Sequence, residues 1–124
     1  MIAVDTSSMI AYFQGKIDRD AQVVAEIIRN NSICLSPAVV TELISYPSLE
    51  SSVIENILML PTLGIKDGYW ERAGRNRSII LSKKFKARTL DALIAQSSID
   101  HNVPLLTRDA DFQHFEQYCG LTRL

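Results

Sequence analysis

The feature that most constrains the fold is a repeated succession of a very short apolar segment and a helix-forming segment. Ile2-Ala3-Val4 leads straight into Asp5-Thr6-Ser7, and Ile33-Cys34-Leu35 leads into Ser36-Pro37. Apolar side chains then recur at helical spacing after each short segment. Strands that alternate with helices pair in parallel through right-handed crossovers, and helices cover both faces of the sheet. We therefore predict an α/β fold with a mainly parallel central sheet.

The rest of the chain extends this pattern. Further strands are expected at residues 63–65 and 103–106, and residues 121–124 can add an edge strand, which gives a sheet of four to five strands flanked by helices. The length of 124 residues falls within the ~100–200 residues typical of one domain. We therefore expect a single domain that spans residues 1–124.

The sequence also bears on the cellular compartment. The segment from Met1 to Asp5 has no basic region and reaches a carboxylate at once, which is unlike a signal peptide, and no apolar run approaches the ~20 residues that cross a bilayer. Cys34 and Cys119 are too few and too far apart for a disulfide framework or a zinc site. We expect a cytoplasmic protein with no membrane association.

Acidic residues follow the expected strands. Asp5 and Asp109 come directly after the first and fourth strands, and Glu42 and Asp91 lie in helices that begin near the same end. Ligands of parallel sheets bind outside the carboxyl ends of the strands. Each acid taken alone is more simply explained as a helix cap or a surface residue. Because they are predicted to converge, however, they indicate a site for a hard cation such as Mg²⁺ or Mn²⁺.

Basic residues are concentrated in one stretch, although the net charge is only −1. Seven of the thirteen lie in it, and no Asp or Glu interrupts them before Asp91: Arg72, Arg75, Arg77, Lys83, Lys84, Lys86 and Arg88. Such a stretch attracts a phosphate backbone, although a solvated helix face and loop is the more common explanation when the stretch is considered alone. Its position beside Asp91 favours the phosphate interpretation.

Four segments, in order along the chain, resemble the successive motifs of PIN-domain ribonucleases, and most of all those of VapC-type toxins. They are Val4-Asp5-Thr6-Ser7, Thr41-Glu42-Leu43, the run Leu90-Asp91-Ala92-Leu93-Ile94-Ala95, and the run from Leu105 to Phe112. The resemblance covers essentially the whole chain. Two departures concern the turn Lys83-Lys84-Phe85-Lys86, which lacks a glycine, and Gln96-Ser97-Ser98, which replaces small apolar residues. They bear on the shape of an RNA groove and on helix packing.

The resemblance assigns roles to individual residues. It implies that the catalytic, metal-binding acids are Asp5, Glu42, Asp91 and Asp109, with Asp111 as an additional ligand or a contact through water. It implies that Thr6 and Thr107 support these ligands. The basic residues expected to contact RNA are Lys83, Lys84, Lys86 and Arg88.

The resemblance also implies an activity and partners. The activity is Mg²⁺- or Mn²⁺-dependent endoribonucleolytic hydrolysis of RNA that leaves 5′-phosphate and 3′-hydroxyl ends. The expected partners are a second copy of the chain in a homodimer and a small antitoxin protein, which can insert a basic side chain into the acidic site.

Other interpretations of the sequence remain open. A phosphoreceiver-like signalling domain shares the length and the acidic strand end, with Asp67 as phosphoacceptor, but this chain has a single Asp after its first strand and no Lys near its last. A catalytically silent module would keep the fold and bind RNA or protein. An RNase H-like nuclease opens with an antiparallel meander, whereas a helix is expected here directly after the first strand.

Histidines and aromatic residues give weaker signals. His101 and His114 have neither metal-ligand spacing nor a nucleophile partner. The rings of Tyr69, Trp70 and Phe85 can stack on bases, but aromatic residues at helical spacing more often belong to the core.

Overall fold

The computed structural model describes residues 1–124, and its centre is a three-stranded parallel sheet with the order β2-β1-β3. The strands are very short: β1 is Ile2–Val4, β2 is Ile33–Cys34 and β3 is Leu105–Leu106. The first strand of the chain therefore lies in the middle, and Ala3 pairs with a residue of each neighbour. The predicted α/β class with a parallel central sheet is confirmed.

The sheet has three strands where we expected four to five. The segment expected at 121–124 contributes a single bridge, between Arg123 and Leu105. On the other edge, the bridge to Leu35 comes from Thr62, one residue before the strand expected at 63–65. The N–H of Leu35 donates to the carbonyl oxygen of Pro61, and its carbonyl oxygen accepts from the N–H of Leu63. Pro61 lacks an N–H group and Gly64 has no side chain to pack in a strand, so pairing does not propagate further along the chain.

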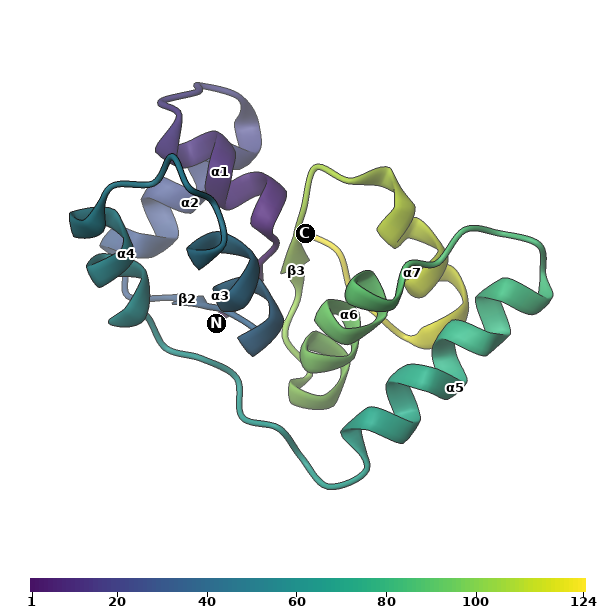
Figure 1. The fold of residues 1–124 in the computed structure, drawn as a ribbon. Helices are drawn as coiled ribbons and strands as arrows, with labels where there is room; N and C mark the ends of the chain where they lie inside the picture. The colour runs from purple at the N-terminus through teal and green to yellow at the C-terminus, as the bar shows by residue number, and fades with distance from the viewer.

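Seven α-helices surround the sheet in two groups (Figure 1). One group comprises α1 (Thr6–Phe13), α2 (Arg19–Arg29), α3 (Pro37–Ile44) and α4 (Ser51–Leu58). The other comprises α5 (Tyr69–Ser82), α6 (Thr89–His101) and α7 (Gln113–Cys119), which follows the short 3₁₀ helix η1 (Ala110–Phe112). The long connection from α4 to α5 joins the groups along the bottom of the view. None of the helices combines the length and the apolar character needed to cross a bilayer.

The core explains why the strand ends are fixed. Val4 and Leu106 are fully buried in the two paired strands, and Met9, Phe112 and Phe115 pack into the same apolar cluster. Just beyond the core, the N–H of Asp5 donates to the carbonyl oxygen of Leu106 at 2.9 Å. The carboxyl ends of β1 and β3 are therefore held side by side, and the residues that follow them lie next to each other.

The start of α3 has the cap that its sequence predicts. Ser36 caps α3 as expected, because its hydroxyl accepts a hydrogen bond from the N–H of Val39 at 3.3 Å, and Pro37 occupies the first helical position.

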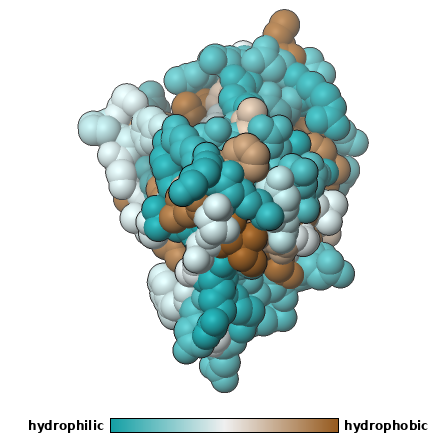
Figure 2. All heavy atoms as spheres, turned by 90° about the vertical axis from the view of Figure 1, so that its right-hand side faces the viewer, coloured by the Kyte–Doolittle hydropathy of each residue, from teal (hydrophilic) through white to brown (hydrophobic).

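Tyr69 lies in the core as expected, whereas Trp70 and Phe85 are 65% and 40% exposed, so the core interpretation is wrong for these two rings. Figure 2 shows that the face carrying α5 is mainly hydrophilic with small hydrophobic patches.

One ion-pair network ties the segment after β3 to the start of α2. The Nε and Nη2 atoms of Arg108 donate to the two carboxylate oxygens of Asp20 at 2.8 and 2.7 Å, and Nη2 also donates to Asp18 at 2.8 Å. These bonds lower the pKa of Asp20 to about 2. Because Asp20 is only 8% exposed, its charge depends on this partner.

We predict that Arg108→Ala lowers the free energy of unfolding at pH 7 by about 1–3 kcal/mol, because it leaves the buried Asp20 unpaired. The folded-state pKa of Asp20 lies below its unfolded value of 3.8. The contribution is therefore complete above pH ~4 and is lost as the pH falls towards ~2. Urea denaturation at pH 7 and at pH 2.5 measures both values.

A matched control is Arg123→Ala, which removes the exposed pair with Glu116 and should cost less than about 1 kcal/mol. An Arg108→Ala effect that is the same at both pH values would contradict this account of Asp20.

Candidate functional site

The site begins at Asp5, which follows β1 and is only 5% exposed. Its Oδ2 atom accepts hydrogen bonds from the hydroxyls of Ser7 and Thr107, both at 2.8 Å. Burial raises the pKa of Asp5, while these two hydroxyls lower it and the charge of Asp109 adds a further upward push. Asp5 is therefore a fixed carboxyl group at the end of the central strand, in an environment that favours a nearby cation.

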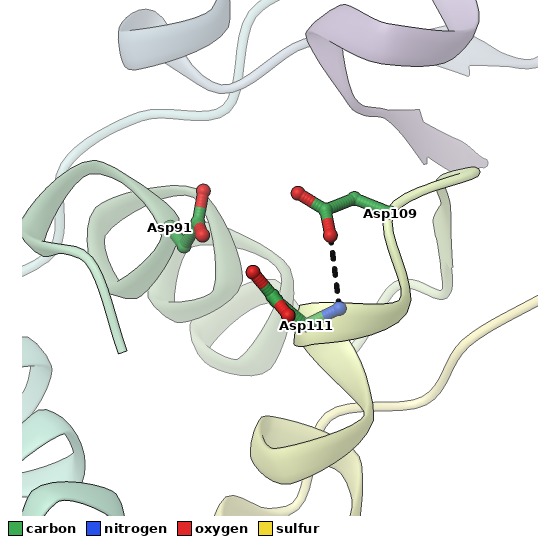
Figure 3. A group of neighbouring side chains, drawn as sticks. All are labelled: Asp91, Asp109 and Asp111. Carbon is green, nitrogen blue, oxygen red and sulfur yellow. Dashed lines mark hydrogen bonds between the residues drawn. The ribbon is translucent and has the colours of Figure 1, made fainter. Parts of the chain in front are cut away.

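Three more carboxylates converge beside it. One oxygen of each of Asp91, Asp109 and Asp111 lies within 4.8 Å of the others, and the three groups face one another (Figure 3). Asp91 comes from the first turn of α6, and the other two come from the segment after β3. The Oδ1 atom of Asp109 accepts a hydrogen bond from the N–H of Asp111 at 2.9 Å, which orients the pair. Oxygen ligands at this spacing fit a hard divalent cation.

The electrostatics of Asp91 support the same interpretation. Burial raises the pKa of Asp91 to about 6, Arg88 acts against this shift, and the charges of Asp109 and Asp5 add to it. Carboxylates that crowd together repel one another and favour a cation that neutralises them. The donor set of this site therefore fits a divalent cation in charge as well as in geometry.

Glu42 lies outside the group of three. It is partly exposed on α3, and its Oε1 atom accepts a hydrogen bond of 2.6 Å from the hydroxyl of Thr6, the residue next to Asp5. Thr107 links the remaining acids, because its hydroxyl donates to Asp5 and accepts from the N–H of Asp109 at 3.0 Å. The five predicted acids thus form a core of three, with Asp5 joined through Thr107 and Glu42 joined through Thr6.

Two of the basic residues expected to contact RNA lie against the acids. The Nε atom of Arg88 donates to Asp91 at 3.2 Å, and its Nη2 atom donates to Asp109 at 3.1 Å. The ammonium group of Lys86 is 3.6 Å from Asp111. Both side chains remain largely exposed, at 57% and 65%. Arg88 holds the N-cap position of α6, one turn before Asp91, so the clustered negative charge attracts it directly.

The other two basic residues do not contact the acids. Lys83 and Lys84 are exposed, and the Lys83 ammonium lies 4.7 Å from the centre of the Tyr118 ring. Sequence reasoning missed Ser7, whose hydroxyl reaches back two residues to Asp5. The signal for it was the spacing, since Ser and Thr hydroxyls often bond to groups two residues away.

An apolar groove opens beside Glu42. It has a volume of about 640 Å³ and lies between α3, the start of α5 and α6. Its lining includes Pro37, Tyr46, Ile65, Trp70 and Leu90. The indole of Trp70 is 65% exposed, which is unusual for the largest apolar side chain of the protein. This groove is the largest of the protein's described cavities and adjoins the acidic site.

Comparison with known proteins identifies the family. The PIN domain family matches residues 2–117, which is nearly the whole chain, and the chain belongs to this family. The resemblance found in the sequence is thereby confirmed. Among curated proteins, none matches the chain significantly.

Solved structures share the fold over its full length. VapBC2 from Rickettsia felis, bound to a promoter DNA fragment, is similar with a TM-score of 0.75 and 21% identity, over 100% of this chain and 98% of that chain. VapBC-1 from Haemophilus influenzae gives 0.76 and 18%, over 100% and 97%. VapBC-5 from Mycobacterium tuberculosis, a member of the VapBC family of toxin-antitoxin systems, gives 0.66 and 16%, over 98% and 97%. At identities this low, the structural similarity shows a common fold.

The buried carboxyl group of Asp91 leads to a prediction for the metal-free protein. Its folded-state pKa of about 6 lies above the unfolded value of 3.8, so ionising it costs stability. The cost is complete above pH ~6 and disappears below pH ~4. We therefore predict that Asp91→Asn stabilises the protein at pH 7 by about 1–3 kcal/mol and has little effect near pH ~4.

Urea denaturation in the presence of EDTA measures this difference. Asp67→Asn is the control, because Asp67 is exposed and lies outside the carboxylate cluster, and it should change stability by less than about 0.5 kcal/mol. Destabilisation by Asp91→Asn at pH 7 would show that its pairing with Arg88 outweighs the cost of burial.

Proposed function

We propose that this protein is a divalent-cation-dependent endoribonuclease that acts as the toxin of a toxin-antitoxin pair. The observation that carries the proposal is the convergence of Asp91, Asp109 and Asp111, with Asp5 alongside, at the carboxyl end of the central sheet of a PIN domain. The cation is Mg²⁺ or Mn²⁺, because the available ligands are carboxylate oxygens. The products are RNA fragments with 5′-phosphate and 3′-hydroxyl ends.

In this proposal the acids share the work of binding the cation. Asp5, Glu42, Asp91 and Asp109 are its ligands, with Glu42 contributed by α3, and Asp111 adds a ligand or a contact through water. Magnesium keeps several of its waters, so few direct protein ligands suffice. When bound, the cation lowers the pKa of a water molecule and offsets the negative charge that develops on the phosphate.

The surrounding polar groups keep the acids in position. The hydroxyls of Ser7 and Thr107 fix the carboxyl group of Asp5, and the hydroxyl of Thr6 fixes Glu42. Fixed ligands need no reorganisation when the cation binds. Mutation of these hydroxyl residues therefore acts through the orientation of the carboxylates.

Basic residues bind the RNA backbone. Lys83, Lys84, Lys86 and Arg88 lie in a stretch without acids from residue 72 to residue 90, next to the carboxylates. Arg88 and Lys86 contact the acids at 3.1–3.6 Å, and a cation that takes over these carboxylates frees both side chains for phosphate oxygens. One pair of cationic residues thus serves the site before and after the substrate arrives.

The partners follow from the fold and the surface. Because structures with this fold include VapBC complexes, we infer an antitoxin partner. Its most suitable location is the apolar groove beside Glu42, where an apolar segment would cover Trp70 and a basic residue would reach the acids.

Homodimerisation remains a prediction, for which the exposed Leu58 and Met59 at the end of α4 offer apolar surface.

The remaining parts of the proposal rest on the sequence. Location in the cytoplasm agrees with two free cysteines, Cys34 and Cys119. The phosphoreceiver-like alternative is less favoured, because Asp67 is not among the clustered carboxylates. A catalytically silent binding module is distinguished by measuring cleavage.

Cleavage of structured RNA tests the proposed activity. With Mg²⁺ or Mn²⁺, we expect the wild-type protein to cut RNA and Asp91→Asn to cut it more than about 100-fold more slowly, because a ligand of the cation is lost. EDTA should abolish cleavage by the wild type, and Asp67→Asn should retain it. Cleavage that persists in EDTA or in Asp91→Asn would contradict a cation-dependent mechanism, and a wild type that cuts no RNA would favour the silent module.

The position of Arg88 predicts its effect on cation affinity. Because the cation competes with the Arg88 guanidinium for Asp91 and Asp109, Arg88→Gln should bind Mn²⁺ about two- to fivefold more tightly, as expected for exposed ion pairs. Calorimetric titration measures the affinity. The control is Lys83→Gln, whose side chain contacts no carboxylate, and it should bind Mn²⁺ like the wild type. Unchanged or weaker binding by Arg88→Gln would exclude competition.

A further inference from the structure

An exposed aromatic ring lies between the carboxylate site and α7. Phe85 belongs to the turn between α5 and α6, and its ring is stacked on His114, with centroids 4.3 Å apart and planes inclined by 13°. The ring of Tyr118, one turn further along α7, lies 6.2 Å away and is nearly parallel. The ring of Phe85 is therefore stacked against side chains of α7, and the residue is still 40% exposed.

The conformation of the turn explains this orientation. Lys84 adopts a left-handed conformation with φ of 67°, at a position where helices usually end in glycine. Its N–H donates to the carbonyl oxygen of Leu81 at 3.0 Å, and the N–H of Phe85 donates to that of Ile80 at 3.4 Å. The chain is thus turned back against the end of α5, and the ring of Phe85 is directed onto α7. The absence of glycine keeps a third lysine in the turn.

The surroundings of the ring are cationic and adjoin the acidic site. The Lys83 ammonium lies 4.7 Å from the centre of the Tyr118 ring, and Lys84 is exposed. On the other side, Lys86 is adjacent to Phe85 in the chain and reaches Asp111 at 3.6 Å. His114, which supports the Phe85 ring, follows Asp111 by three residues. A flat apolar surface flanked by ammonium groups suits an unpaired base between two phosphates.

We propose that Phe85 is a stacking platform for an unpaired RNA base close to the phosphate that is cleaved. His114 supports the inner face of the ring, the outer face receives the base, and Lys83 and Lys86 bind the flanking phosphates. The proposal rests on the proposed ribonuclease function and adds to it a residue that contacts a base of the RNA. Because every base has an aromatic face, this contact selects unpaired nucleotides with little preference for sequence.

The competing role for Phe85 is as an apolar cover of α7, and one substitution separates the two roles. Phe85→Leu keeps an apolar side chain over His114 and Tyr118 but removes the flat face. Trp70→Leu is the matched control, because it removes an exposed aromatic side chain near the opposite end of α5. Thermal unfolding of both variants shows whether they fold like the parent protein.

The first measurement is the affinity for fluorescently labelled RNA by anisotropy, in an Asp91→Asn background with Mg²⁺, so that the RNA is bound and not cut. The probes are a single-stranded 10-mer and a 10-mer of the same backbone without bases. We expect Phe85→Leu to weaken binding of the first probe by about five- to 100-fold, as for the loss of one base stack. It should leave binding of the abasic probe unchanged, and Trp70→Leu should not affect the first probe.

The second measurement detects the stack directly. Phe85→Trp in a Trp70→Phe background contains one indole, at the platform, and its fluorescence should be quenched by the single-stranded probe but not by the abasic one. Equal affinity of Phe85→Leu and its parent for the single-stranded probe, or no quenching on binding, would overturn the platform while RNA binding stands. If the parent protein binds neither probe and the wild type cuts no RNA, the proposed function itself fails, and the platform fails with it.

Discussion

The pairing of β1 with β3 is the constraint on which the rest of the site depends. It joins the first residues of the chain to residues 105 and 106, and the Thr107 hydroxyl then bonds to Asp5, 102 positions away in the sequence. Val4 and Leu106, at the carboxyl ends of the two strands, are fully buried. The backbone at Asp5 and Thr107, which follow them, therefore has little conformational freedom. Asp109 and Asp111 follow within a few residues, and α6 brings Asp91 to the same point. The geometry of the carboxylates therefore derives from a few backbone hydrogen bonds in the core.

Nearby basic side chains offset part of the negative charge that this geometry brings together. Burial is the main cause of the raised pKa values of Asp5 and Asp91, and repulsion by the neighbouring carboxylates adds to it. Within the chain, Arg88 and Lys86 offset part of that charge, and Arg108 is directed away from the cluster to Asp18 and Asp20. Three basic residues near the acids thus have different tasks. Two moderate the charge of the site, and one anchors the segment that carries two of the acids.

Much of the fold followed from local patterns. The order of strands and helices, the parallel sheet and the cap of α3 by Ser36 depend on residues close together in sequence. The weakest expectations concerned residues whose state depends on distant partners. In place of the strands expected at 63–65 and 121–124, the structure has single bridges at Thr62 and Arg123, since pairing there depends on how the chain approaches β2 and β3. Similarly, exposure of Trp70 and Phe85 depends on the groove and on α7, which periodicity within one helix cannot reveal.

The same limit applies to the acidic site. The acids themselves could be found from strand ends and motifs, but the separation of Glu42 from the cluster required the position of α3 relative to α6. Charge along the chain indicated Arg88 and Lys86 as basic residues, yet only the fold revealed that they lie on the carboxylates. The sequence thus identified the acidic and basic residues of the site, whereas the distances between them depend on tertiary packing.

The central position of β1 has a consequence for synthesis of the protein on the ribosome. β1 emerges before its two neighbours, and its pairing with β3 joins Ala3 to Leu105, 102 positions later in the sequence. The nascent chain therefore cannot assemble the carboxylate cluster until β3 and the two acids that follow it, Asp109 and Asp111, have left the exit tunnel. Under the proposed ribonuclease function, this order of assembly keeps the growing polypeptide inactive while β3 is still inside the ribosome.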